Sequence, residues 1–404
     1  MLIIKFLFLF AKFVLLKDTE SLCIVYMKTP VFQEKYSEFS EDSFTIGNMS
    51  GFVDGCFNTE SFSMDPEVTV EEDSVVHINY SWGLDRINQR NLPLNGNLNY
   101  GYSGDNTNIY IVDTGINYKI PDFKGRAFWG ANFADSENID CNGHGTHVAG
   151  TTSSSTYGVS KGSSVYAVKV LGCDGSGSIS SIIKSLEWVL NHSRTSNKPG
   201  IVNMSLGGSK SMALETAVEQ LINNGMFVVV AAGNENSDAC NSSPAGSKSA
   251  ITVASSDNLD NRSVFSNWGS CVDIFAPGTN IPSWNQNGNP WVISGTSMAS
   301  PHVAGVVSLL LSKYSFTPME LKNKLVEMST KMKIKNTNGS PNNLLFVEET
   351  LSSEPTNTVT VTVTSTATST NTVTSTATST STVTSTTSVS CTLTEVPIPT
   401  LVIQ

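Results

Sequence analysis

The chain is poor in basic residues. It holds 24 Lys and Arg against 35 Asp and Glu, which gives a formal net charge of −11, and no basic cluster interrupts this balance. Proteins that bind nucleic acid carry basic patches that meet the phosphates. The sequence therefore argues against a nucleic-acid partner. The acidic balance bears on solubility and says little about the substrate.

The two ends of the chain lack an apolar run long enough to span a bilayer. The N-terminal apolar stretch, residues 6–16, is interrupted by Lys12 and is too short for a membrane span. With Lys5 before it, the stretch is typical of a secretory signal. We expect a signal peptide over residues 1–20 and a secreted protein. A signal anchor is the alternative, because no small-residue cleavage site marks the end of the run. The apolar end at 396–403 is also too short for a span.

The C-terminal segment, residues 349–404, lacks the side chains that build a core. Between 357 and 394 nearly every residue is Thr, Ser or Val, and none is charged. Too few large apolar residues remain to form a packed structure, so we expect a disordered Ser/Thr-rich tail. In a secreted protein this composition is typical of an O-glycosylated stalk, which would contact a cell wall or coat. The absence of proline and the Val/Thr alternation favour a strand or an aggregating segment if the tail is bare.

A serine before a helix-like run is the first candidate for chemistry. Ser297 follows a glycine and precedes the apolar stretch 303–311. At a helix start, backbone N–H groups and the helix dipole favour negative charge, which suits a nucleophile in acyl transfer. Taken alone, such a serine is equally well explained as a helix cap.

Two further motifs supply partners for this serine. The apolar, β-branched run 109–112 ends at Asp113 and is typical of a buried strand in a parallel sheet. Catalytic groups gather at that end of such strands. His144 lies among glycines at the start of a small-residue helix. Alone, Asp113 could cap a turn and His144 could be a loop histidine. With Ser297 they provide the three roles of a serine hydrolase.

The three motifs, at residues 113–115, 142–147 and 295–302, resemble the active-site signatures of the subtilisin-like serine proteases. The nearest likeness is to the proteinase K and aqualysin branch, and it extends over most of the chain. The resemblance implies an α/β, three-layer fold with a mostly parallel central sheet, here over residues 81–348. It also implies a serine endopeptidase that acts on protein or peptide substrates without a catalytic cofactor. Ser300 stands where many relatives have threonine, and it keeps a small hydroxyl.

The resemblance assigns roles to individual residues. Ser297 would attack the scissile carbonyl, His144 would take and return the proton, and Asp113 would orient the imidazole. Asn234 follows an apolar strand and resembles the oxyanion-hole asparagine, with the backbone N–H of Ser297 as its companion. Two other histidines, each a few residues beyond a catalytic position, are predicted to be packing residues: His147 and His302.

Glycine-rich backbone follows two of the predicted strands. Glycines let a substrate backbone approach closely, and an extended peptide adds as a strand between such edges. The resemblance places these edges and the specificity pocket at Ser176, Gly177, Ser178, Ser205, Leu206, Gly207, Ala231, Ala232 and Gly233. Small apolar walls, with no acidic residue evident at the base, predict broad or large-hydrophobic specificity. Ordinary glycine turns remain the alternative for any one residue.

The seven cysteines fit an oxidising compartment. The resemblance implies two disulfides, Cys141–Cys173 and Cys240–Cys271. Each would close a loop of about thirty residues and contribute roughly 3–4 kcal/mol to stability. Cys23 and Cys56 are then left to pair with each other, and Cys391 remains for an intermolecular bond.

Residues 21–80 resemble the inhibitory propeptide that precedes these proteases. They form a small predicted α+β segment with strand-like stretches at 23–27 and 66–76. In the family, the propeptide assists folding, inhibits the enzyme and is cut by it, and here the cut would fall near residues 79–81. The segment is shorter than usual for the family. An N-terminal subdomain that is never removed is the alternative. We expect the enzyme to be a monomer.

The resemblance also implies structural calcium, which binds carboxylate and carbonyl oxygens. Asp273 stands where relatives have a calcium carboxylate, with the carbonyls of Lys248 and Ala250 as further ligands. A second group resembles another calcium loop and consists of Asp85, Asn88 and Gln89. Both are alternatively ordinary polar loops.

Four of the Asn-x-Ser patterns in the chain predict N-glycosylation, and one of these four lies in a predicted strand and is expected to be buried. They begin at Asn191, Asn241, Asn261 and, in the strand, Asn203. Two other functions compete with the peptidase. One is a wall or coat protein that keeps the fold with a silent site, which the intact triad argues against. The other is an esterase, which would lack the propeptide and the peptide-binding edges.

Overall fold

The structure is a computed structural model that describes residues 22–27, 43–46, 49–55, 62, 65–72, 81–96 and 102–348. The chain divides into two units, Met1–Leu351 and Ser352–Gln404, and the second lies outside the described residues. The predicted signal peptide and Ser/Thr-rich tail also fall outside them. Within the described ranges, no helix combines the length and apolar character needed to cross a bilayer.

A nine-stranded sheet forms the centre of the large domain. Its strands lie in the order β16-β17-β13-β12-β10-β8-β5-β7-β6. All neighbours pair in parallel except β16 with β17. The strands are β5 Asn108–Asp113, β6 Ala127–Asn132, β7 Ser164–Lys169, β8 Gly200–Met204, β10 Phe227–Ala231, β12 Ile251–Ser256, β13 Ile274–Pro277, β16 Thr330–Lys331 and β17 Asn343–Leu344. Strands β5, β8, β10 and β12 are buried along their whole length, as expected for a parallel sheet covered on both faces.

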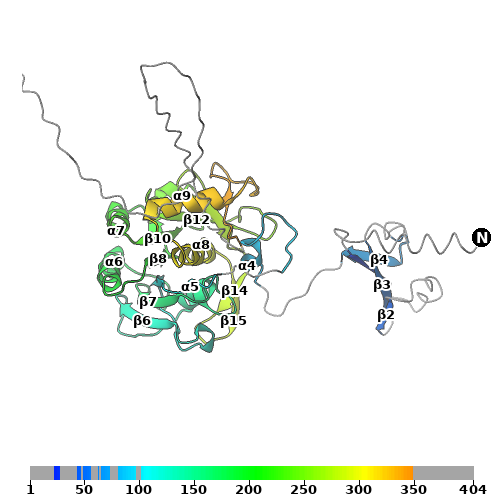
Figure 1. Ribbon diagram of the computed structural model, residues 1–404, viewed down its shortest axis with the longest axis horizontal. Coiled ribbons are helices and arrows are strands. Elements are labelled where there is room, and N and C mark those ends of the chain that lie inside the picture. Colours follow the sequence, from blue (N-terminus) through cyan, green and yellow to red (C-terminus); the bar gives the residue numbers. More distant parts are fainter. Residues whose placement is uncertain are drawn as a thin grey trace, which may run out of the picture. The chain divides into compact units, whose positions relative to one another are not determined.

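Helices cover the two faces of this sheet. They are α4 Trp82–Arg86, α5 His144–Ser153, α6 Ile179–Ser193, α7 Met212–Asn223, α8 Thr296–Leu311 and α9 Pro318–Met328. Alternate strand residues point to opposite faces: Ile109 and Ile111 join the core under α5 and α8, while Tyr110 and Val112 join the core under α6 and α7. Figure 1 shows α6 and α7 on one side of the strands and α5 and α8 on the other. The predicted three-layer α/β fold is confirmed.

Hydroxyl side chains cap the N-termini of several of these helices. Ser178 accepts a hydrogen bond from the N–H of Ser181 at the start of α6, and Ser211 caps α7 in the same way. Thr317 and Glu320 form a reciprocal capping box at the start of α9. Short elements complete the domain: η3 Pro121–Phe123, η4 Ala239–Asn241, and the strand pairs β9 Gly208–Ser209 with β11 Ser242–Ser243 and β14 Ile281–Trp284 with β15 Pro290–Ile293.

The described part of the predicted propeptide is an antiparallel sheet. Its strands are β1 Leu22–Met27, β2 Ser43–Ile46, β3 Met49–Gly55 and β4 Val68–Glu72, in the order β2-β3-β1-β4. Val25, Met27 and Phe52 are buried in its core, with Val68 and Val70 packed against them. The strand-like stretches predicted at 23–27 and 66–76 thus correspond to β1 and β4. Strands β2 and β3 had no counterpart in the sequence prediction.

Both predicted disulfides of the large domain form. Cys141 and Cys173 have Cα atoms 5.0 Å apart, and those of Cys240 and Cys271 are 5.3 Å apart. Cys23 is also disulfide-bonded. Its predicted partner Cys56, like Cys391, lies outside the described residues.

The four Asn-x-Ser patterns named above differ in exposure. Asn191 and Asn241 are exposed, whereas Asn203 is fully buried in β8, as predicted. The Asn261 amide donates hydrogen bonds to both carboxylate oxygens of Asp257. Of these four, Asn191 and Asn241 are the ones whose side chains are exposed.

Candidate active site

A carboxylate and an imidazole meet at the C-terminal end of the sheet. Asp113 ends β5 and is fully buried, and its Oδ1 lies 2.8 Å from Nδ1 of His144, the first residue of α5. The imidazole is 26% exposed on the groove side. Burial disfavours the charged ring, but the Asp113 charge, its hydrogen bond and the Asp140 charge together raise the pKa of His144 above its ordinary value of 6.5. The pair is arranged to stabilise an imidazolium.

A second carboxylate, which the sequence analysis did not identify, holds the two catalytic segments together. Asp140 Oδ1 accepts hydrogen bonds from Thr114 Oγ1 at 2.9 Å and from the Gly143 N–H at 2.8 Å. Its Oδ2 accepts from the N–H and hydroxyl of Thr146 in the first turn of α5. A carboxylate is favoured at a helix N-terminus. Its position four residues before His144 was the available signal, and only the fold shows that it also reaches the residue after Asp113.

The candidate nucleophile lies in the first turn of α8, as the sequence predicted. Ser297 Oγ donates to the carbonyl of Ser205 at 3.1 Å, and the Ser205 hydroxyl donates back to the carbonyl of Ser297 at 2.8 Å. Among the hydrogen bonds of the described residues, none joins Ser297 Oγ to His144. Nucleophile and base are often further apart in a substrate-free site than in the reacting complex.

The candidate oxyanion asparagine is oriented by the residue before the serine. Asn234 Oδ1 accepts from the backbone N–H of Thr296 at 2.8 Å and from its hydroxyl at 3.0 Å. With the amide oxygen engaged, the Nδ2 group is left as the donor. The N–H of Ser297 belongs to the first turn of α8, where backbone donors have no partner within the helix. Two donors are therefore available near the serine.

Two adjoining pockets share the backbone 206–209 and lie beside the triad. One, of about 490 Å³, is lined by His144, Ser176 and Gly177. The other, of about 430 Å³, is lined by Ser297 and by the predicted specificity residues Ala231, Ala232 and Gly233. Ser205 lines the first pocket, and Leu206 and Gly207 line both. Apart from Ser178, the predicted edge and specificity residues therefore line these two adjoining pockets.

Two details differ from the sequence prediction. Ser178 is absent from the residues that line either described pocket, and its hydroxyl caps α6. Glu235 lines the second pocket, although no acidic residue was evident there from the sequence. Its Oε2 accepts from the Asn267 amide at 2.7 Å and from the Asn234 N–H at 3.0 Å. The glutamate adjoins the asparagine in sequence, and the fold turns it toward the pocket.

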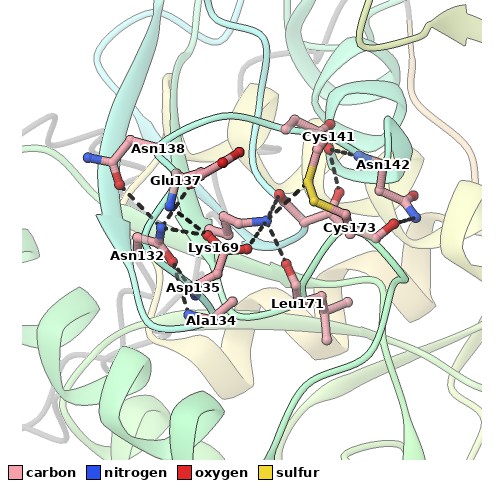
Figure 2. A network of polar contacts seen from close by, with 12 residues as sticks. Asn132, Ala134, Asp135, Glu137, Asn138, Cys141, Asn142, Lys169, Leu171 and Cys173 are labelled. Atoms are coloured by element: carbon pink, nitrogen blue, oxygen red, sulfur yellow. Dashed lines mark hydrogen bonds and ion pairs between the residues drawn. A yellow bond between two sulfur atoms is a disulfide. The ribbon is translucent and has the colours of Figure 1, made fainter.

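A buried lysine ties the catalytic end of the sheet together (Figure 2). Lys169 ends β7, is fully buried, and donates from Nζ to the carbonyls of Thr114 at 3.0 Å and Leu171 at 2.9 Å. Its third partner is Oδ2 of Asp135 at 3.2 Å. Thr114 follows Asp113, and Leu171 lines the first pocket. One ammonium thus anchors both the carboxylate segment and a wall of the groove, next to the Cys141–Cys173 disulfide (Figure 2).

The residues predicted to bind calcium through Asp273 do come together, but around a side-chain cation. Nζ of Lys322 lies 2.9 Å from Asp273 Oδ2 and donates to the carbonyls of Lys248 at 2.9 Å and Ala250 at 2.7 Å. Burial raises the pKa of Asp273, against the opposing effects of Lys322 and the Thr252 N–H. Because an ammonium already occupies the position among these oxygens, this arrangement does not fit a calcium ion.

The second predicted calcium group lies in and after α4. Asp85 Oδ2 accepts from the Gly96 N–H at 2.8 Å, and the Gln89 amide donates to the carbonyls of Asn91 and Pro93. Oε1 of Gln89 is buried and accepts no hydrogen bond from the described residues. A buried oxygen without a donor, four residues after a carboxylate in the sequence, is a ligand type that a hard cation prefers. The described residues contain no group of three or more His, Cys, Asp or Glu that could hold a metal.

The two histidines beyond the catalytic positions are packing residues, as predicted. His147 Nε2 lies 3.0 Å from the Ile281 carbonyl, and His302 Nδ1 lies 2.8 Å from that of Met298. Both rings are fully buried, and burial lowers the pKa of His147 to about 3 and that of His302 to about 4. Both are therefore neutral at ordinary pH.

Comparisons with known proteins agree with this geometry. The profile described as "Subtilase family" matches residues 104–346. Alkaline serine exoprotease A of Vibrio alginolyticus is 46% identical over 287 residues, which cover 70% of this chain and 53% of the relative. Extracellular serine proteinase of Thermus sp. (strain Rt41A) is 49% identical over 273 residues, which cover 66% of each chain. The chain thus spans about half the length of the first of these relatives.

A solved structure shows the same fold. It is described as "Crystal structure of a cold adapted subtilisin-like serine proteinase" and matches with a TM-score of 0.64 and 47% sequence identity. The match covers 67% of this chain and 99% of the other.

Proposed function

The chain belongs to the subtilase family, and we propose that it is a serine-type endopeptidase acting through an acyl-enzyme. The observation that carries the proposal is that the groups needed for acyl transfer lie together at the C-terminal end of the sheet. His144 with its partner Asp113 behind it, Ser297 at a helix start and Asn234 with its amide oxygen engaged come together there, and His144, Ser297 and Asn234 line two adjoining pockets. Each group suits one role in acyl transfer.

In the proposed mechanism, Ser297 Oγ turns from the Ser205 carbonyl and attacks the scissile carbonyl carbon. Nε2 of His144 takes the hydroxyl proton, while Asp113 holds Nδ1–H and stabilises the imidazolium. The oxyanion is held by Asn234 Nδ2 and the Ser297 N–H. His144 then protonates the leaving amine. Water repeats the sequence on the acyl-enzyme, releasing the carboxylic acid and restoring the serine.

We propose that the substrate is a peptide in extended conformation, laid between the backbone segments 175–177 and 205–207. Gly207 supports this assignment, because among the described residues a Cβ added there would have only the Ser243 carbonyl within 4 Å, at 3.6 Å, so the glycine leaves the pocket side open. The small walls at Ala231, Ala232 and Gly233 favour a large apolar side chain in the second pocket. Glu235 does not set a preference for Lys or Arg in this proposal, since its Oε2 is already held by two donors.

We further propose that the enzyme is secreted and made as a zymogen. The relative from Thermus is named an extracellular proteinase, and disulfides require an oxidising compartment. Residues 21–80, whose described part is a separate antiparallel sheet, would act as the inhibitor and be cut near 79–81. Glycans would be added at Asn191 and Asn241, which are exposed. A structural calcium would be held by the group Asp85, Asn88 and Gln89, and the enzyme would be a monomer.

The deciding experiment compares Ser297→Ala with Ser294→Ala in the full chain. Ser294 belongs to the same motif, but it is exposed and accepts a hydrogen bond from the Asn280 N–H. Ser297→Ala should abolish both casein hydrolysis and N-terminal processing, read by mass spectrometry, whereas Ser294→Ala should keep both. If Ser297→Ala still digests casein and is still processed, the chain is not a serine peptidase of this mechanism. A wild type without activity would favour the wall or coat protein instead.

A further inference from the structure

We propose that Lys322 is a built-in cation that takes the place of a structural calcium in this chain. The ammonium of a lysine has three N–H donors. Here each finds one acceptor: the Lys248 carbonyl at 2.9 Å, the Ala250 carbonyl at 2.7 Å and Asp273 Oδ2 at 2.9 Å. The set is complete, so no donor and no formal charge is left uncompensated.

The position of this site explains what the cation does. Ala250 precedes β12 and Asp273 precedes β13, two neighbouring parallel strands, so the carbonyl and carboxylate oxygens gather where the strands begin. Oxygen atoms alone would repel one another there and favour a bound cation. Lys322 projects from α9, whose Leu321 and Leu325 are buried in the core. The ammonium therefore fastens a helix to two strand starts as well as balancing the charge.

The site is sufficiently buried for the ion pair between Lys322 and Asp273 to contribute to the stability of the fold. The Lys322 side chain is only 13% exposed and that of Asp273 20%. Asp273 Oδ2 also accepts from the Thr252 N–H at 2.8 Å, and its backbone carbonyl accepts from the Asn343 amide. Removing one member of such a pair leaves a poorly solvated charge. With lysine in place the fold needs no metal here, whereas loss of the lysine recreates an oxygen cage.

The test measures thermal unfolding of the full chain in a Ser297→Ala background, which prevents self-digestion. The variants are Lys322→Ala, the double variant Lys322→Ala/Asp273→Asn, and Lys324→Ala as the matched control. Lys324 lies on the same helix, and its Nζ is 3.5 Å from the exposed Glu327. In EDTA, Lys322→Ala should lower the Tm by about 5 °C, and Lys324→Ala by about 1 °C or less.

Calcium should then separate the variants. Adding 10 mM CaCl₂ should return about 5 °C to Lys322→Ala beyond the change seen in the background protein, and equimolar MgCl₂ should return less. The double variant should show no such extra gain. A calcium response of Lys322→Ala equal to that of the background protein, or a Tm unchanged by the substitution in EDTA, would overturn the proposal. Calcium bound elsewhere acts on every variant equally and cancels in this comparison.

A second measurement needs no substitution of the lysine. Brief acylation of the folded protein with an N-hydroxysuccinimide ester, followed by peptide mass spectrometry, compares Lys322 with Lys324. To react, Lys322 must lose its hydrogen bonds to two carbonyls and its ion pair with Asp273, so it should be modified at least about tenfold more slowly. Equal modification of the two lysines would contradict a locked internal cation, even if Lys322→Ala failed to fold.

Discussion

A lysine lies at each end of the parallel strands of the central sheet, one at their C-terminal end and one near their N-terminal end, and the two lysines have the same kind of partners. Lys169 at the C-terminal end of β7 donates to two backbone carbonyls and pairs with Asp135, and Lys322 beside the starts of β12 and β13 does the same with Asp273. They differ in where the backbone carbonyls that accept their hydrogen bonds lie. Those of Lys169 lie next to Asp113 and in the groove wall, whereas those of Lys322 lie in the connection that leads into β12.

This difference means that Lys169 positions groups of the active site as well as stabilising the fold, whereas Lys322 stabilises the fold alone. In a parallel sheet the strand ends converge on the catalytic groups, so the same ammonium geometry at that end also fixes distances within the site. At the other end it can affect only the free energy of unfolding. The comparison yields three predictions, beginning with the catalytic end itself.

Asp113→Asn should have the largest effect. An amide cannot hold the imidazole in the required tautomer or stabilise its cation, so kcat should fall by roughly 10⁴-fold. Progress curves with a chromogenic peptide would measure the loss. Asp257→Asn, at a carboxylate that holds an exposed loop, is the control and should keep kcat within about twofold. A loss of less than tenfold in Asp113→Asn would mean that His144 does not depend on this carboxylate.

Replacing each buried lysine by methionine tests the comparison directly. Lys169→Met should cost about 3 kcal/mol of unfolding free energy and lower kcat/KM by roughly tenfold, because the segments of Asp113 and Leu171 lose their common anchor. Lys322→Met should lower the unfolding free energy and leave kcat/KM unchanged. Urea unfolding and steady-state kinetics on both variants provide the readout. Equal kinetic losses in the two variants would remove the distinction between the two ends.

The smallest expected effect is a shift in pH dependence. The general base must be neutral, so kcat/KM should rise with pH through an apparent pKa above 6.5, since the pKa of His144 is raised. Asp140→Asn should move this acidic limb to lower pH by about half a unit, because Asp140 contributes to the rise. Glu187→Gln, an equal charge change on an exposed residue of α6, should leave the limb in place.

The contribution of His144 to the stability of the fold falls as the pH rises, whereas its contribution to kcat/KM increases. A raised pKa in the folded state means that the protonated pair stabilises the fold fully below about pH 6.5, and that this contribution disappears as the pH rises through the folded pKa. A chain whose kcat/KM limb lies below pH 6.5 would contradict both statements. The enzyme thus gains its active base at the cost of a small part of its stability.

Much of the site could be predicted because its chemistry lies in short segments. Asp113, His144, Ser297 and Asn234 each sit in a local pattern that a strand end or helix start explains, and the disulfides follow from the resemblance. Asp140 was missed because its role is to bridge Thr114 and the α5 turn, segments that no local pattern links. Ser178 was assigned to the groove although its hydroxyl is used by its own helix.

The sequence by itself determined the order of the catalytic groups, since each lies in a short local motif, and the resemblance that these motifs carry implied the fold class and the two cysteine pairs of the large domain. Only the tertiary structure decided which donor reaches which acceptor. The resemblance implied calcium at the oxygens near Asp273, yet a lysine from a later helix lies among them. Whether a metal ion or an ammonium group binds these oxygens depends on which groups the folded chain places between them. That arrangement exists only after the strands and α9 have packed together.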